Sequence, residues 1–182
     1  MLHKKHTDQK RKNNKESPYI NHPIEVSYIL STCGITDLVV LCAAVLHDTV
    51  EDTSTSYTEL VENFGKKIAD VVIECSDDKS LDKIKRKMIQ IEKASHASAE
   101  AKLVKLADKF SNLSGLLHDP PSLWSRETII GYAKWCFVVC NQLYGLNEGL
   151  DKLVKNVFEE FEISSVTNDE LLNYYDNIKE TE

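Results

Sequence analysis

Polar side chains that suit a metal ion and its bound water are concentrated in one short run of the chain. The run LHDTVED, Leu46–Asp52, lies at the end of an apolar stretch. If the stretch is helical, residues four apart share a face, so His47 aligns with Glu51. Asp48 aligns with Asp52 in the same way. One helical turn then presents an imidazole and three carboxylates, which is too polar for a core and well suited to a metal ion.

Two further residues extend this pattern to other parts of the chain. His22 lies in YINHPIEV and Asp108 lies in KLVKLADKFSNL. Each has a simpler interpretation, because His22 can cap or pack a helix start and Asp108 can be an ordinary helix-face carboxylate. However, Asp108 lies beside an apolar stripe, where an unpaired charge is unusual. Two imidazoles and two carboxylates favour Mn²⁺, Zn²⁺ or Fe²⁺ over Ca²⁺.

These residues and the strings around them resemble a known family. The order His, His-Asp, Asp is that of the HD-domain metal-dependent phosphohydrolases. The strings YINHPIEV, AAVLHDTVEDT, SDDKSL and KLVKLADKFSNL are similar to the hydrolase domain of RelA/SpoT-type enzymes, above all to their small stand-alone animal branch. The resemblance runs from about residue 6 to about residue 150. It implies an all-α HD-domain helical bundle that forms a single domain.

The resemblance also implies roles for the polar residues. The ligands of one divalent ion, expected to be Mn²⁺ with Zn²⁺ or Fe²⁺ as alternatives, are His22, His47, Asp48 and Asp108. Glu51 and Asp52 match the acidic pair beside the metal, where a carboxylate can position water or accept its proton. The division of these roles between the two stays open.

Substrate contacts are expected from residues that match the family's nucleotide site or carry suitable charge. Arginine and lysine suit phosphate groups, and an arginine can also stack on a base. The candidates are Arg11, Lys12, Lys79, Lys105, Asn112, Arg126 and Tyr132.

The implied reaction is the hydrolysis of guanosine 3′,5′-bis(diphosphate), ppGpp, to GDP and pyrophosphate. Nothing resembles the family's separate synthetase domain. Ser114 and Gly115 stand where relatives usually carry an arginine and a polar residue, so a different nucleotide preference is an alternative. We therefore also consider removal of the 2′-phosphate of NADPH, and a non-catalytic nucleotide sensor.

Composition fits a globular hydrolase that acts on a small molecule. The 182 residues are enough for one domain with a real core, and 42% of them are hydrophobic. Residues 1–15 are basic, residues 159–182 are acidic, and the net charge of −7 argues against broad nucleic-acid binding. No apolar run is long enough to span a membrane, and no secretory signal is evident. The five cysteines lack a paired pattern and indicate free thiols in a reducing, cytoplasmic setting. We expect a monomer or weak homo-oligomer.

Periodicity predicts an almost wholly helical chain. Asn21 is expected to cap a helix that ends near Gly34, and Thr36 or Asp37 to cap the helix that carries LHDTVED. Further helices are expected over residues 55–64, 66–75, 81–93, 97–117, 123–143 and 147–161, and residues 1–12 are expected to end another. The hydrolase domain is assigned to residues 1–162. The acidic tail, residues 163–182, either docks as a short helix or stays mobile.

Overall fold

A computed structural model describes residues 9–13 and 15–179 and confirms the all-α, single-domain prediction. No strand occurs within these residues, and Lys10 and Pro18 form one isolated bridge. The helices are α2 (Asn21–Thr32), α3 (Leu38–Leu46), α4 (Thr49–Asp52), α5 (Tyr57–Phe64), α6 (Lys66–Cys75), α7 (Lys83–Ala94), α8 (Ala99–His118), α9 (Arg126–Cys140), α10 (Glu148–Glu160) and α11 (Asn168–Lys179).

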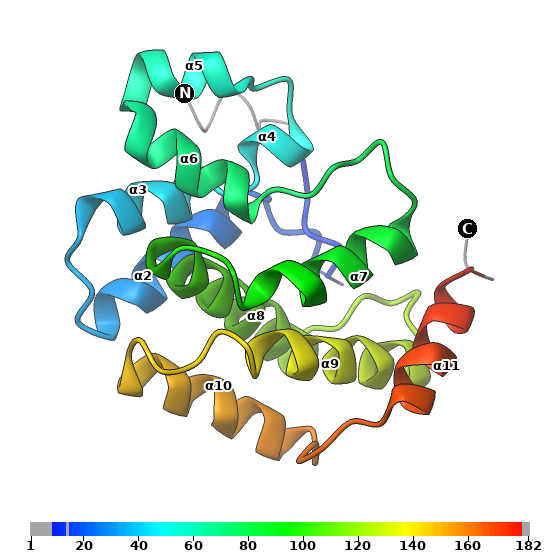
Figure 1. Cartoon of the computed structure of the whole chain (residues 1–182). Coiled ribbons are helices and arrows are strands. Elements are labelled where there is room, and N and C mark those ends of the chain that lie inside the picture. The colour runs from blue at the N-terminus through cyan, green and yellow to red at the C-terminus, as the bar shows by residue number, and fades with distance from the viewer. Residues whose placement is uncertain (1–8, 14, 180–182) are drawn as a thin grey trace.

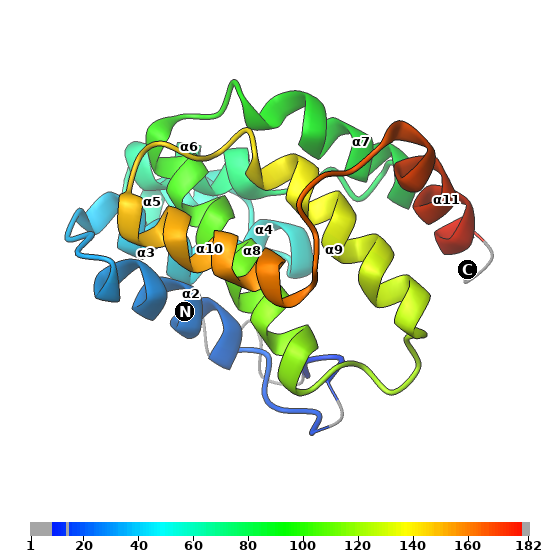
Figure 2. The same cartoon turned by 90° about the horizontal axis from the view of Figure 1, so that it is seen from below.

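Helix α8 is the centre of the bundle. It packs against α2, α3 and α6 on one side and against α9 and α10 on the other (Figures 1 and 2). Its apolar side chains Val104, Leu106 and Leu113 are fully buried. Because α8 touches most of the other helices, a polar residue on it can meet residues from distant parts of the sequence. Among the described residues, no helix is both long and apolar enough to cross a membrane.

Side-chain caps explain where many helices begin. Asp37 accepts a hydrogen bond from the backbone N–H of Val39 and so starts α3. Serine, aspartate or asparagine side chains cap α5, α7, α8, α9 and α10 in the same way. After α2 the chain turns through Gly34, whose φ of 81° is a conformation that a side chain would strain.

The helix that carries LHDTVED is broken, which corrects the sequence prediction of a continuous helix. Helix α3 ends at Leu46, and the four-residue helix α4 begins at Thr49. His47 and Asp48 are therefore the cap residues between two helices. Glu51 and Asp52 belong to the single turn of α4 and are not at the end of a long helix.

Two other local predictions were wrong. Asn21 is the first residue of α2 and does not cap it, since the N-cap position is Ile20. Residues 9–12 are not helical, because Lys10 pairs with Pro18 and the backbone N–H of Arg11 bonds to Ser17. The rest of the helix expected over residues 1–12 lies outside the described residues.

The acidic tail docks as a helix. Helix α11 packs against α9 and α7, and Figure 1 shows it in red beside the end of α9. Tyr174, Tyr175 and Ile178 bury their side chains there. Lys134 of α9 pairs with Glu170 at 2.6 Å. Of the two outcomes considered for this segment, the structure therefore has the docked helix.

Candidate metal centre

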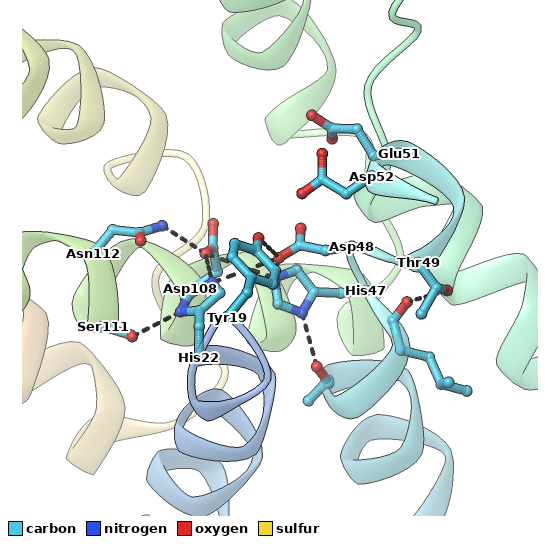
Figure 3. Close-up of polar contacts among 12 residues, drawn as sticks. Tyr19, His22, His47, Asp48, Thr49, Glu51, Asp52, Asp108, Ser111 and Asn112 are labelled. Atoms are coloured by element: carbon cyan, nitrogen blue, oxygen red, sulfur yellow. Dashed lines mark hydrogen bonds and ion pairs between the residues drawn. The ribbon is translucent and has the colours of Figure 1, made fainter. Parts of the chain in front are cut away.

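Four polar residues that are distant in sequence meet where α2, α3 and α8 pack together. His22 lies in the first turn of α2, and Asp108 lies in the middle of α8. His47 and Asp48 occupy the break between α3 and α4. The break turns both side chains of the His-Asp pair toward α2 and α8 (Figure 3).

Two imidazole nitrogens and two carboxylate oxygens face one another in this cluster. His22 Nε2 lies 3.0 Å from Asp108 Oδ1 and 3.7 Å from Asp48 Oδ2. His47 Nε2 lies 3.0 Å from Asp48 Oδ2 and 3.7 Å from Asp108 Oδ1. The ligand atoms of His22, His47 and Asp48 all lie within 4.8 Å of one another. Asp108 is not in that group of three, but its Oδ1 lies within 3.7 Å of both imidazole nitrogens, so the four side chains face one small space.

Hydrogen bonds on the far side of each imidazole decide which nitrogen faces the cluster. His47 Nδ1 lies 2.8 Å from the carbonyl oxygen of Ala44, which can only accept, so Nδ1 carries the proton. Ser111 Oγ donates to Glu25 at 2.8 Å and lies 3.0 Å from His22 Nδ1, so this nitrogen also donates. In the neutral form, both rings therefore turn an unprotonated Nε2 toward the carboxylates.

The residues present fit a divalent metal ion. Both histidines are buried, and His47 Nε2 makes no hydrogen bond of ordinary geometry to the described residues. Two nitrogen lone pairs beside two carboxylates repel one another unless a cation or protons lie between them. The mixed nitrogen and oxygen donor set suits a borderline transition metal. An HD-type divalent site is thus supported by the chemistry of these four side chains.

Comparison with known proteins agrees with this site. A family model described as an HD domain matches residues 1–133. The chain belongs to the HD domain family. The mouse guanosine-3′,5′-bis(diphosphate) 3′-pyrophosphohydrolase MESH1 is 48% identical over 157 residues, which are 86% of this chain and 88% of that protein. The human MESH1 is 47% identical over 158 residues, again 86% and 88%.

A solved structure supports the same family assignment. It is that of a metazoan ortholog of SpoT that hydrolyses ppGpp, with 44% sequence identity and a TM-score of 0.85. The match covers 87% of this chain and 90% of that one. The resemblance to the stand-alone animal branch of RelA/SpoT-type HD domains is therefore confirmed.

The group of four, His22, His47, Asp48 and Asp108, is here called the HD cluster, and further polar residues contact its two carboxylates. Tyr19 donates a hydrogen bond to Asp48 Oδ2. Lys109 Nζ lies 2.7 Å from Asp108 Oδ2, and Asn112 donates to Asp108 Oδ1 at 2.7 Å. Burial raises the pKa of Asp108, but the charge of Lys109 and the two imidazoles together outweigh it and hold that pKa well below its usual range. Burial also raises the pKa of Asp48, but His47 and His22 together lower it to about 2. Both carboxylates are thus kept ionised, as a metal site would require.

Glu51 and Asp52 lie beside the HD cluster on α4 (Figure 3). Glu51 accepts a hydrogen bond of 3.0 Å from the backbone N–H of Asp77. Burial raises the pKa of Glu51, and nearby carboxylates add to that effect. Asp52 instead pairs with Lys79 at 2.6 Å. Glu51 lies farther from its basic neighbours, 3.6 Å from Lys79 and 3.9 Å from Arg86, so the two acids have different surroundings.

A cavity of about 550 Å³ opens onto the HD cluster, and most of the predicted substrate residues line it. Those that line it are Arg11, Lys12, Lys105, Asn112 and Tyr132. Lys79 does not line it, but it reaches the edge of the site through Asp52. Arg126 is the exposed first residue of α9 and lies outside the cavity lining.

Sequence reasoning missed three residues that hold the HD cluster in place. They are Tyr19, Lys109 and Ser111. Tyr19 stands in the same string as His22, so that string contained a signal. A buried lysine next to Asp108 was a second signal, since charges beside an apolar stripe need partners. Ser111 had none, because its contact with His22 joins residues 89 positions apart.

Proposed function

We propose that this protein is a metal-dependent pyrophosphohydrolase that converts ppGpp to GDP and pyrophosphate. The observation that carries the proposal is the cluster of His22, His47, Asp48 and Asp108, with both Nε2 atoms turned inward, in a cavity that basic side chains also line. The relatives named above are ppGpp 3′-pyrophosphohydrolases and are similar over most of their length. The proposed ion is Mn²⁺, held by these four residues.

The metal would supply a bound water of lowered pKa and polarise a phosphate oxygen. Glu51 would accept the water's proton, because burial already raises the pKa of its carboxyl and it has no ion pair closer than 3.6 Å. Asp52 would hold Lys79 at the cavity edge through their 2.6 Å contact. Asn112 and Lys109 would keep Asp108 fixed while the substrate binds.

Basic residues of the cavity would bind the substrate's phosphate groups. Arg11, Lys12 and Lys105 line it with their charged side chains. Arginine and lysine bind phosphate through charge-assisted hydrogen bonds. Tyr132 adds an aromatic wall, on which a purine ring can pack.

NADPH is the second candidate substrate. A neighbouring cavity of about 1010 Å³ shares several lining residues with the first, among them Trp124 and Tyr132. That volume is at the upper end of pockets that take small ligands. A dinucleotide that carries a 2′-phosphate therefore belongs in the same assay.

We further propose a cytoplasmic location. All five cysteines are free in the structure, and free thiols are typical of reducing compartments. Fractionation of cells that express the protein would test this.

The function is tested by measuring release of pyrophosphate from ppGpp with Mn²⁺ present. We expect turnover by the wild type, loss of both metal and turnover in Asp48→Ala, and loss of turnover with metal retained in Glu51→Gln. Glu62→Gln, a change at an exposed carboxylate of α5, is the matched control and should be fully active.

Failure of a folded, metal-loaded wild type to hydrolyse ppGpp would overturn the proposal. Phosphate release from NADPH in the same assay would then favour the second candidate. Binding of nucleotides without turnover of either compound would favour a nucleotide sensor.

A further inference from the structure

Helix α7 presents a row of basic residues to the cavity of about 1010 Å³, here called the distal cavity. Lys83, Arg86 and Lys87 line it together, and their spacing of three and four places them on one face of the helix. Lys109, which supports the metal cluster, lines both cavities. The distal cavity is therefore continuous with the metal centre and cationic along one wall.

Lys87 is held in this wall by three aromatic rings, here called the aromatic cage. Its ammonium lies 3.7 Å from the ring centroid of Trp135, 4.9 Å from that of Tyr132 and 5.5 Å from that of Tyr174. Trp135 also donates its indole N–H to the carbonyl oxygen of Lys87 at 3.1 Å. The same tryptophan thus fixes both the backbone and the charge of Lys87.

The charge of Lys87 is not neutralised by the described part of the chain. No carboxylate there forms an ion pair with it, whereas Lys79 pairs with Asp52 and Lys109 pairs with Asp108. Burial lowers the pKa of Lys87 to about 7, and Lys109 and Lys83 add to that effect. An ammonium that has lost water but gained no counter-ion is ready to bind an anion, because the anion supplies the missing interaction.

Tyr174 reaches the aromatic cage only because α11 is docked. Its ring lies against Gly131 of α9, where an added Cβ would come within 2.6 Å of Tyr174 Cδ2. Lys134 and Glu127, on the same helix as Gly131, bind Glu170 at 2.6 Å and Asn177 at 3.1 Å. Helix α11 is therefore held along its length, and it places Tyr174 and Ile178 in the wall of the distal cavity.

We propose that α11 is part of the substrate-binding machinery. Tyr174, which packs on Gly131, completes the aromatic cage around Lys87. Lys87, positioned in this way, binds the diphosphate that is not cleaved. This inference rests on the proposed function, since ppGpp carries a second diphosphate on its 5′ side. Tyr174 acts through Lys87 and is a positioning residue. The expected signature is weaker substrate binding with little change in kcat.

The test measures binding of ppGpp by calorimetry in the Mn²⁺-loaded Glu51→Gln protein, so that binding is separated from hydrolysis. We expect Lys87→Gln to weaken binding by about 10-fold, the value of one charge-assisted hydrogen bond. Tyr174→Ala should weaken it by a smaller factor, and Tyr174→Phe should restore it, because the ring and not the hydroxyl faces the ammonium.

Matched controls come from the same two helices. Lys85→Gln changes an exposed lysine of α7, and Leu172→Ala shortens an exposed leucine of α11 that does not line the cavity. Neither should alter the affinity for ppGpp. Guanosine 3′-diphosphate, which lacks the 5′ diphosphate, should bind the Lys87→Gln protein as well as it binds the background.

Three results would overturn the inference. They are unchanged ppGpp affinity in Lys87→Gln and Tyr174→Ala, equal losses in Tyr174→Ala and Leu172→Ala, and no binding of ppGpp by the background protein. If the wild type hydrolyses ppGpp while Lys87→Gln binds normally, only this inference fails. If Lys87-dependent binding is found without wild-type hydrolysis, the inference stands and the proposed function fails.

Discussion

Ser111 and His22 form the contact that orients one side of the metal centre. Ser111 Oγ lies 3.0 Å from His22 Nδ1 and donates its own proton to Glu25 at 2.8 Å. Because the Ser111 hydroxyl donates its only proton to Glu25, it must accept a hydrogen bond from His22 Nδ1–H. This series of hydrogen bonds, here called the relay, leaves His22 Nε2 without a proton and able to accept. The orientation of this histidine is therefore built into the contact between α2 and α8.

Replacement of Ser111 by alanine should weaken metal binding. The change removes the acceptor for His22 Nδ1–H, and loss of such a partner typically costs about 10–100-fold in metal affinity. The measurement is competition for Mn²⁺ against a chelating dye. Ser114→Ala, on the same helix but without a contact to either histidine, should bind Mn²⁺ as the wild type does. Equal affinities in the two variants would contradict the relay.

Turnover should fall at acidic pH. Burial raises the pKa of Glu51 above its ordinary 4.5, so its carboxylate gains a proton at a higher pH than an exposed one would. A base that must be ionised is lost as the pH falls through that raised value, so kcat should decline as the pH is lowered, and at a higher pH than an ordinary glutamate would give. Metal content is measured at each pH, since protonated histidines release metal. A flat profile with full metal occupancy would argue against Glu51 as the base.

The ion pair of Glu170 and Lys134 should make the docking of α11 depend on pH. The hydrogen bond from Lys134 lowers the pKa of Glu170 to about 2. Because this pKa is lowered, the ion pair stabilises the docked state fully when the pH is above 4.5, the ordinary pKa of a glutamate. This stabilisation is lost as the pH falls from 4.5 toward 2. The protection of α11 amides, taken relative to their intrinsic exchange rate at each pH, should therefore fall in this range, by a small amount because the pair is solvent-exposed. Glu170→Gln should show lower protection at neutral pH and little further change.

Alanine at Gly131 should loosen α11 although alanine is the better helix former. The new Cβ would come within 2.6 Å of Tyr174 Cδ2 and 3.3 Å of its Cβ, so the whole residue must move. Overpacking costs about 1–3 kcal/mol, which outweighs the roughly 1 kcal/mol that alanine contributes to helix stability. Thermal unfolding should show a lower Tm. In Gly115→Ala the nearest heavy atom is Arg11 Nη2 at 3.7 Å, so that variant should be neutral or more stable.

The local sequence was enough to predict the fold class, most helix positions and the metal-ligand candidates. Caps such as Asp37 and breaks such as Gly34 act within a few residues, so they can be read from short strings. The strings shared with the HD-domain family, in turn, are sufficient to single out His22, His47, Asp48 and Asp108 as candidate ligands. The break between α3 and α4 was not predicted, because apolar periodicity continues up to it.

Only the tertiary structure decided how these residues act together. It brought His22 within 3.0 Å of Asp108, 86 residues away, and turned Asn112 onto the same carboxylate. It also paired Lys79 with Asp52 and left Arg126 outside the cavity lining. Side-chain direction and the packing of distant helices are not encoded in local periodicity. For the same reason, the docking of α11 and the aromatic cage around Lys87 became visible only in three dimensions.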